Sequence, residues 1–217
     1  MLRFTFGAGN QRLERVLCLG AHCDDIEIGC GGTLLRLLDE HPSLEVCWVI
    51  FASDEARRRE AERSADRFLR GARSKTLICH AFRDGFFPYS GHELKDVFLR
   101  LEKEFFPDLV LTHYRHDLHQ DHRLVSELTW NSFRNHLVLE YEIPKYDGDL
   151  GSPNFFVPLS SDICNRKIDY LLSSFPSQRS KFWFTESTFL ALLRLRGLEI
   201  RSATDFAEAF YCRKVQV

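Results

Sequence analysis

The sequence lacks the features that mark membrane-spanning and nucleic-acid-binding proteins. No apolar run approaches the ~20 residues that a membrane helix needs, so we expect no membrane span. The 29 Lys and Arg are balanced by 31 Asp and Glu, for a formal net charge of -2. Without an excess of basic charge, nothing points to nucleic acid as a partner.

Cysteine spacing typical of a small disulfide-rich domain is also absent. The seven cysteines are an odd number without such a pattern, so we expect reduced thiols in a reducing cytoplasm, mostly as small buried apolar groups. A single Met against 19 Phe predicts a core of large flat rings. The length of 217 residues suits one well-packed domain spanning residues 1–217.

The glycine pattern of a dinucleotide-binding loop is incomplete. Gly29, Gly31 and Gly32 follow a predicted strand, but Leu34 stands where the third glycine of that fingerprint is needed. We therefore interpret these glycines as positions that allow a tight turn and close helix packing.

What the sequence does contain is a regular alternation of strand and helix patterns. Short apolar runs predict strands at residues 15–19, 44–51, 75–80, 109–112, 137–143 and 207–215. Apolar residues at helical spacing predict helices at 31–40, after the cap residues 53–54, from 94 to 105, and at 122–134, 164–175 and 186–196. This alternation predicts an α/β domain with a mainly parallel sheet and right-handed crossovers.

Three segments are expected to be loops that shape a binding pocket: residues 83–91, 144–158 and 182–185. Ligands of open parallel sheets bind beyond the carboxyl ends of the strands. The loops that follow those ends are therefore the places to look for functional residues.

Two such loops are rich in metal-binding residue types. His22, Asp24 and Asp25 follow the first strand, and His119 and His122 follow the strand at 109–112. Because both loops leave the same edge of the sheet, we expect them to close around one divalent metal. Catalytic zinc usually has three protein ligands and one open position, and His22, Asp25 and His122 are the predicted ligands.

The remaining residues of the two loops suit hydrolysis. A metal-bound water needs a base, and Asp24 beside a ligand is the candidate. A protonated His119 would stabilise an oxyanion and protonate a leaving amine, while Asp121 would orient His119 or His122. Glu27 is expected either to serve the site indirectly or to stabilise the N-terminus of the following helix.

The two motifs resemble those of the LmbE-like, or PIG-L, family of metal-dependent N-deacetylases. They are His22-Cys23-Asp24-Asp25, followed by Gly-Cys-Gly-Gly-Thr-Leu, and His119-Gln120-Asp121-His122. The resemblance covers most of the chain, with two departures: Cys23 and Gln120 each stand where the family often has proline.

This resemblance implies a Rossmann-like, three-layer α/β fold. It implies zinc, or ferrous iron, held by His22, Asp25 and His122, with Asp24 as general base and His119 as electrostatic or acid partner backed by Asp121. It also implies hydrolysis of the N-acetyl group of an N-acetylglucosamine-type amino sugar or its conjugate. Family members often self-associate, so a homo-oligomer is an expectation as well.

Candidates for substrate contact follow from position or from the resemblance. An arginine among residues 57–59 is expected near the metal edge, where Arg59 could bind a phosphate or sugar hydroxyls. His113 directly follows its strand and could touch substrate or metal. Tyr146 is one of several aromatic residues that could stack on a sugar ring, and Gln178 is placed at the pocket by the resemblance alone.

Two other functions fit part of the pattern. A metal-dependent hydrolase of another bond, such as a phosphoester, would use similar residues, but it typically needs a second metal with more carboxylates. A sugar-binding member of the fold without catalytic activity would not need Asp24 and His119, both of which are present.

Overall fold

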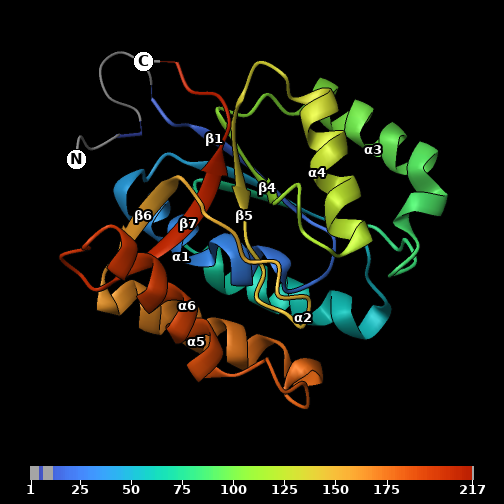
Figure 1. The fold of residues 1–217 in the computed structure, drawn as a ribbon. Helices are drawn as coiled ribbons and strands as arrows, with labels where there is room; N and C mark the ends of the chain where they lie inside the picture. Colours follow the sequence, from blue (N-terminus) through green and yellow to red (C-terminus); the bar gives the residue numbers. More distant parts are fainter. Residues whose placement is uncertain (1–4, 7–11, 217) are drawn as a thin grey trace.

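In the computed structural model, residues 5–6 and 12–216 are described, and they form a seven-stranded sheet covered by helices (Figure 1). The strands are β1 (Arg15–Gly20), β2 (Glu45–Ile50), β3 (Ser74–Cys79), β4 (Leu109–His113), β5 (Leu137–Tyr141), β6 (Phe155–Leu159) and β7 (Phe206–Cys212). Their order in the sheet is β3-β2-β1-β4-β5-β7-β6. The first five strands pair in parallel, while β7 runs antiparallel between β5 and β6. The predicted mainly parallel α/β fold is confirmed.

Helices cover both faces of the sheet, which gives the expected three layers (Figure 1). One layer contains α1 (Asp25–Glu40), α2 (Glu55–Phe68), α5 (Ser161–Ser174) and α6 (Glu186–Glu199). The other contains α3 (Gly91–Glu104) and α4 (Gln120–Ser132). Two short 3₁₀ helices, Phe87–Ser90 and Pro176–Gln178, lie in the connections.

Strand β1 shows why the sheet is buried on both faces. Val16 and Cys18 pack into the apolar cluster shared with α1, whereas Leu17 and Leu19 pack into the cluster under α3 and α4. Successive side chains of a strand point to opposite faces, so a strand covered on both sides reads as an unbroken apolar run. That run is the pattern from which this strand was predicted.

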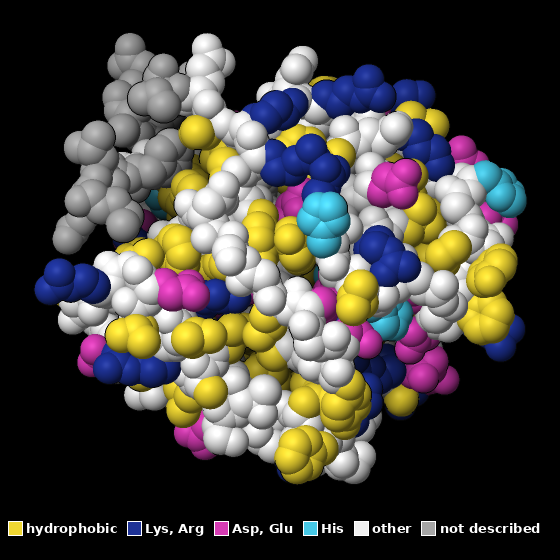
Figure 2. Space-filling model, in the orientation of Figure 1, with side chains coloured by type: hydrophobic (Ala, Val, Ile, Leu, Met, Phe, Trp, Pro, Cys, Tyr) yellow, Lys and Arg dark blue, Asp and Glu magenta, His cyan; other side chains and the backbone are white. Residues whose placement is uncertain are grey.

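Phe rings supply many of the largest buried side chains, as the many Phe predict, although aliphatic residues make up most of the core. Phe51, Phe68, Phe98 and Phe210 are among the largest fully buried side chains. All seven cysteines are free thiols. None of the helices in the described residues combines the length and apolar character of a membrane span. Acidic and basic side chains are interspersed over the face in Figure 2, in keeping with the small net charge.

Helix α1 begins at Asp25, earlier than the predicted start at residue 31. The glycines that suggested a turn are inside the helix because large neighbours leave no space for a side chain. A Cβ at Gly29 would lie 2.1 Å from Tyr141 Cδ2, and one at Gly31 would lie 2.7 Å from Phe68 Cε1. The prediction of close helix packing is confirmed, and that of a tight turn is wrong.

Strand β6 begins at Phe155, inside the segment 144–158 for which only a loop was predicted, and ends at Leu159. Pro158 argues against a strand in the sequence, because proline cannot donate a hydrogen bond to a neighbouring strand and is confined to edge strands. The structure agrees with this rule, since β6 is an edge strand. Other boundaries also differ by a few residues: for example, α6 continues to Glu199 beyond the predicted end at residue 196, and β7 ends at Cys212 rather than at residue 215.

A buried polar link fastens α1 to the far end of the sheet. Glu208 on β7 accepts hydrogen bonds from the backbone N–H groups of Gly32 (2.8 Å) and Thr33 (2.6 Å). Lys167 on α5 completes the link, with its Nζ 2.6 Å from Glu208 Oε1 and 2.7 Å from the carbonyl oxygen of Ile28. The helix that starts at Asp25 is therefore held in place by two other parts of the chain, β7 and α5.

Candidate active site

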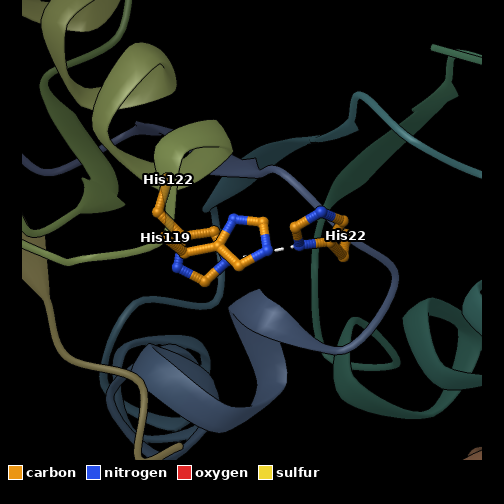
Figure 3. A group of neighbouring side chains, drawn as sticks. All are labelled: His22, His119 and His122. Atoms are coloured by element: carbon orange, nitrogen blue, oxygen red, sulfur yellow. Dashed lines mark hydrogen bonds between the residues drawn. The ribbon is translucent and has the colours of Figure 1, made fainter. Parts of the chain in front are cut away.

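The two predicted loops meet at the carboxyl edge of the sheet. Strands β1 and β4 are parallel neighbours, and each leads into a loop and then a helix, α1 after β1 and α4 after β4. Figure 3 shows the consequence, with His22 from the first loop facing His119 and His122 at the start of α4. Residues almost a hundred positions apart in the sequence are therefore side by side.

Atoms of the three predicted ligands form a small triangle. His22 Nδ1 lies 3.2 Å from His122 Nε2 and 3.3 Å from Asp25 Oδ2, and His122 Nε2 lies 3.6 Å from Asp25 Oδ2. Ligand atoms that bind a tetrahedral zinc ion at 2.0–2.1 Å are about 3.3 Å apart. The spacing and the N/N/O donor set thus fit zinc or another divalent ion of similar preference.

Further donor atoms surround this triangle. His119, and separately His113, can each be grouped with two of the three ligands so that all donor atoms lie within 4.8 Å of one another. Asp84, which the sequence did not single out, reaches His22 Nε2 at 3.0 Å from a largely exposed position. The site therefore offers more ligands than one tetrahedral ion needs.

Carboxylates give this site a strong demand for positive charge. Burial alone would lower the pKa of His22, but Asp25, Asp121 and Asp84 together hold that pKa well above its ordinary value. A proton on the imidazole satisfies the same carboxylates that a bound cation would satisfy. The electrostatics, like the distances, therefore fit a metal.

His122 is presented as a neutral ligand. Its Nδ1 lies 2.9 Å from Asp117 Oδ2, which fixes the tautomer and leaves Nε2 to face the triangle. Burial, reinforced by the neighbouring His113, lowers the pKa of His122 to about 4. An imidazole must be unprotonated on its ligand nitrogen to bind a metal, so both effects favour the predicted role.

The adjacent carboxylates Asp24 and Asp25 have opposite pKa shifts. Burial raises the pKa of Asp24, an effect that Arg57 partly offsets by donating from Nη2 to Asp24 Oδ1 at 2.8 Å. Burial would also raise the pKa of Asp25, but His122 and His113 are among the groups that hold it well below its usual value. Neighbouring carboxyl groups with divergent pKa values commonly divide roles: here a permanent anion and a proton acceptor.

His119 caps helix α4 with its ring. Its Nδ1 accepts a hydrogen bond from the backbone N–H of Asp121 at 3.3 Å, which leaves Nε2 as the donor of the neutral ring. Burial, followed by the positive field of His22, lowers the pKa of His119. A neutral His119 ring can thus donate a hydrogen bond from Nε2, whereas the sequence suggested a protonated ring in this role.

Asp121 makes different contacts from those predicted. Its carboxylate accepts from the backbone N–H groups of Gly85 (2.6 Å) and Phe87 (3.1 Å), and it lies 3.3 Å from His22 Nε2. It thus ties the loop at 84–87 to the first histidine. His122 is instead oriented by Asp117, a residue that no motif indicated.

A cleft of about 880 Å³ opens over these residues. Two of the predicted substrate contacts line it: Tyr146, which is 72% exposed, and Gln178, which is buried with its Oε1 unpartnered. His113 does not line it; fully buried, it accepts from the backbone N–H of Ala21 and lies 3.2 Å from Asp25 Oδ2. His113 thus supports the ligand loop.

Among the arginines at positions 57–59, Arg57 is the one that lines the cleft, while Arg59 points to solvent and pairs with Glu55. Cys23 lines the cleft but is buried, with its Sγ donating to the carbonyl oxygen of Ala52 at 3.5 Å. Burial raises the pKa of this thiol well above the usual range, so it is held as an unreactive thiol. Lys145 and Lys181, which no motif indicated, also line the cleft.

Comparison with known proteins agrees with this geometry. Residues 17–133 match the PIG-L family model, described as GlcNAc-PI de-N-acetylase. N,N'-diacetylchitobiose deacetylase from Pyrococcus horikoshii is 25% identical, with a TM-score of 0.70 over 92% of this chain and 84% of that one. The family and this structure are of deacetylases, which agrees with the class of enzyme predicted.

Two more distant structures share the fold. The zinc-inhibited form of a teicoplanin deacetylase is 16% identical, with a TM-score of 0.68 over 91% of this chain and 97% of that one. The 4-carboxy-2-hydroxymuconate hydratase GalB from Pseudomonas putida KT2440 is 17% identical, with a TM-score of 0.68 over 94% and 98%. The family match covers more than half of the chain and includes both histidine loops, and so this protein belongs to the PIG-L family.

Proposed function

We propose that this protein is a metal-dependent hydrolase that removes the N-acetyl group from an N-acetylglucosamine-type amino sugar or a conjugate of one. The observation that carries the proposal is the triangle of His22, Asp25 and His122, with the raised-pKa carboxyl of Asp24 beside it at the base of the cleft. The family match and the chitobiose deacetylase support the same reaction.

The ligand residues would hold zinc or ferrous iron. Such an ion, when bound, supplies Lewis acidity toward a carbonyl oxygen and toward water. Asp25 contributes the anionic donor, and the two histidines contribute neutral nitrogens. The backbone N–H of His22 donates to Asp25 Oδ2 at 2.6 Å, so the protein itself fixes the orientation of this carboxylate without a metal.

Asp24 takes the proton of the attacking water. Arg57 holds its Oδ1, which leaves Oδ2 to accept that proton. A base works best when its pKa is near the working pH, and burial shifts the pKa of Asp24 in that direction. As the C–N bond breaks, the proton held by Asp24 passes to the departing amine nitrogen. The acetic acid that leaves gives its own proton to solvent, so both protons of the water are accounted for.

His119 stabilises the charge that develops on the acetyl oxygen. The neutral ring, with Nδ1 occupied by the N–H of Asp121, donates from Nε2. A donor fixed in place before the reaction typically contributes about 10²- to 10³-fold to the rate. The ring is held at the N-terminus of α4, close to both histidine ligands.

The sugar would lie in the outer part of the cleft. Gln178 presents a buried carbonyl oxygen that has no hydrogen-bond partner among the described residues, which suits a sugar hydroxyl donor. Tyr146 and Trp183 offer aromatic surface on the same wall. These contacts would fix the ring so that its acetyl group reaches the metal side.

Acetate release from the zinc-loaded protein tests the proposal. The panel contains free, phosphorylated, nucleotide-linked and lipid- or thiol-conjugated N-acetylglucosamine. We expect release from at least one compound, and a loss of about 10²- to 10⁴-fold in kcat in the Asp24→Asn variant with metal content unchanged. Asp54→Asn, a change at another acidic residue of the cleft, is the matched control. No release from any compound by fully metallated protein would favour a sugar-binding protein without turnover.

A further inference from the structure

The connection between β5 and β6 is fastened to the predicted metal site by a lysine whose side chain is largely shielded from solvent. This connection, residues 142–154, is called the pocket loop here because Tyr146 and Asp147 within it line the cleft. Lys145 points inward, with its side chain 10% exposed, and its Nζ lies 2.9 Å from Asp117 Oδ2 and 2.5 Å from Asp149 Oδ2. Asp149 in turn accepts from the backbone N–H of Leu118 at 2.7 Å.

Asp117 is the point at which the loop and the two histidines meet. Its Oδ1 accepts a hydrogen bond from the backbone N–H of His119 at 2.7 Å, and its Oδ2 lies 2.9 Å from His122 Nδ1. Lys145 reaches the same Oδ2. One buried carboxylate therefore touches a predicted metal ligand, the predicted oxyanion donor and the wall of the cleft.

We propose that Asp117 is a positioning residue for both His119 and His122, and that Lys145 makes their alignment depend on the position of the pocket loop. The expected effect on catalysis rests on the proposed function, whereas the expected coupling between the pocket loop and zinc binding does not. A substrate that contacts Tyr146 or Asp147 would hold the pocket loop in place. Through Lys145, it would then also fix the position of the Asp117 carboxylate that orients His122.

The burial of Lys145 supports a role beyond holding a loop. Burying a charged pair costs desolvation free energy that its attraction does not always recover, and an exposed pair such as Lys75 with Asp66 (2.6 Å) avoids that cost. Lys145 instead lies between Asp117 and Asp149, in contact with the carboxylate that also contacts His122. Outer partners of a metal-binding histidine typically change metal affinity or activity about 10- to 100-fold.

The test compares Asp117→Asn, Lys145→Met and Lys145→Arg with the control Lys75→Met. Zinc affinity is measured by competition with a chromophoric chelator, and amide hydrogen exchange of residues 142–154 is followed with and without zinc. We expect about 10- to 100-fold weaker zinc binding in Asp117→Asn and a smaller loss in Lys145→Met. Lys145→Arg should recover part of that loss, and Lys75→Met should match the unmodified protein.

The exchange data decide whether loop and metal site are coupled. Zinc should slow exchange in the pocket loop of the unmodified protein and should have no such effect in Lys145→Met. If zinc leaves the loop unchanged in the unmodified protein, or if Lys145→Met keeps both the zinc affinity and the zinc response, the proposal is wrong. Should Asp117→Asn not fold, the two Lys145 variants still give this answer.

Neither measurement needs a substrate, which separates this inference from the proposed function. Loss of acetate release on every compound would contradict the deacetylase proposal while leaving the zinc and exchange results to be judged separately. Where release is found, Lys145→Met should lower kcat and raise KM together, since both the histidines and the cleft wall are affected. A fall in thermal stability alone, with kcat, KM and zinc affinity unchanged, would reduce Lys145 to a structural residue.

Discussion

The two halves of the cleft are built in different ways. On the metal half, Asp25 and His122 are almost fully buried, and each contacts two or more partners. On the sugar half, Tyr146 is 72% exposed and Phe182, beside the cleft residues Lys181 and Trp183, is 87% exposed. The metal half, with Asp25 and His122, is thus buried and closely packed. The proposed sugar half, with Tyr146 and Trp183, includes side chains that are largely exposed.

This difference follows from where each half sits in the fold. The predicted metal ligands lie in the loops and first helical turns that directly follow the central strands β1 and β4, so the pairing of these strands places them side by side. The sugar half comes from the pocket loop and from residues 178–183, which join elements at the periphery. A fold of this kind can keep one chemistry and change its substrate by altering loops, which sets up three predictions.

The largest effect is expected from removing a ligand on the metal half. His122→Ala should lose both zinc affinity and acetate release. Each loss should exceed the about 100-fold that is expected when only a hydrogen-bond partner of a metal-binding histidine is removed. Zinc content by atomic absorption and kcat on the best substrate are the measurements. His92→Ala, at a histidine with a side chain 83% exposed, should match the unmodified protein. Retention of stoichiometric zinc by His122→Ala would mean that another donor, such as His113, completes the site.

An intermediate effect is expected where the two halves meet, at Arg57. Asp24 is active when ionised, so kcat/KM falls as the pH drops through the pKa of Asp24. The guanidinium of Arg57 lowers that pKa against the effect of burial. Arg57→Met should therefore raise it and move the acid limb of the profile to higher pH, where each pH unit below the pKa costs about tenfold in kcat/KM.

The matched control for that profile is Arg58→Met, since Arg58 is exposed and pairs with Glu62 away from the cleft. An acid limb that stays in place, or moves to lower pH, in Arg57→Met would show that Asp24 does not control it.

The smallest effect is expected on the sugar half. Tyr146→Ala should raise KM about 2- to 12-fold, the range for loss of one aromatic contact, with kcat nearly unchanged. Tyr89→Ala is the control, because Tyr89 is 78% exposed and lies outside the cleft. A drop in kcat as large as that of Asp24→Asn would contradict the division of the cleft into two halves.

The metal half was predictable from sequence because its signal is local. Strands such as β1 and β4 are continuous apolar runs, and their ends bring adjacent polar residues to one edge of the sheet. The role of Asp117 was not predictable in the same way. Several carboxylates lie near His122 in sequence, and only three-dimensional distances show which of them reaches its Nδ1.

Helix geometry explains why Arg57 lines the cleft and Arg59 does not. Successive residues of an α-helix are turned by about 100°, so residues two apart lie roughly 200° from each other around the axis. Arg57 and Arg59 on α2 therefore face opposite ways, one toward Asp24 and the other toward Glu55. Without knowing which face of α2 meets the cleft, the sequence offered no reason to prefer Arg57.

The link from Glu208 to the backbone of Gly32 has a consequence for the order in which the molecule is made. The two residues are 176 positions apart, so the segment with His22 and Asp25 leaves the ribosome long before its anchor on β7 exists. Contacts of such long sequence separation form late and slow the folding of a domain. A nascent chain that has only reached α4 already carries every predicted ligand, but it lacks the strand that holds the first helix still. We therefore expect the predicted metal site to reach its final geometry only after β7 has been made.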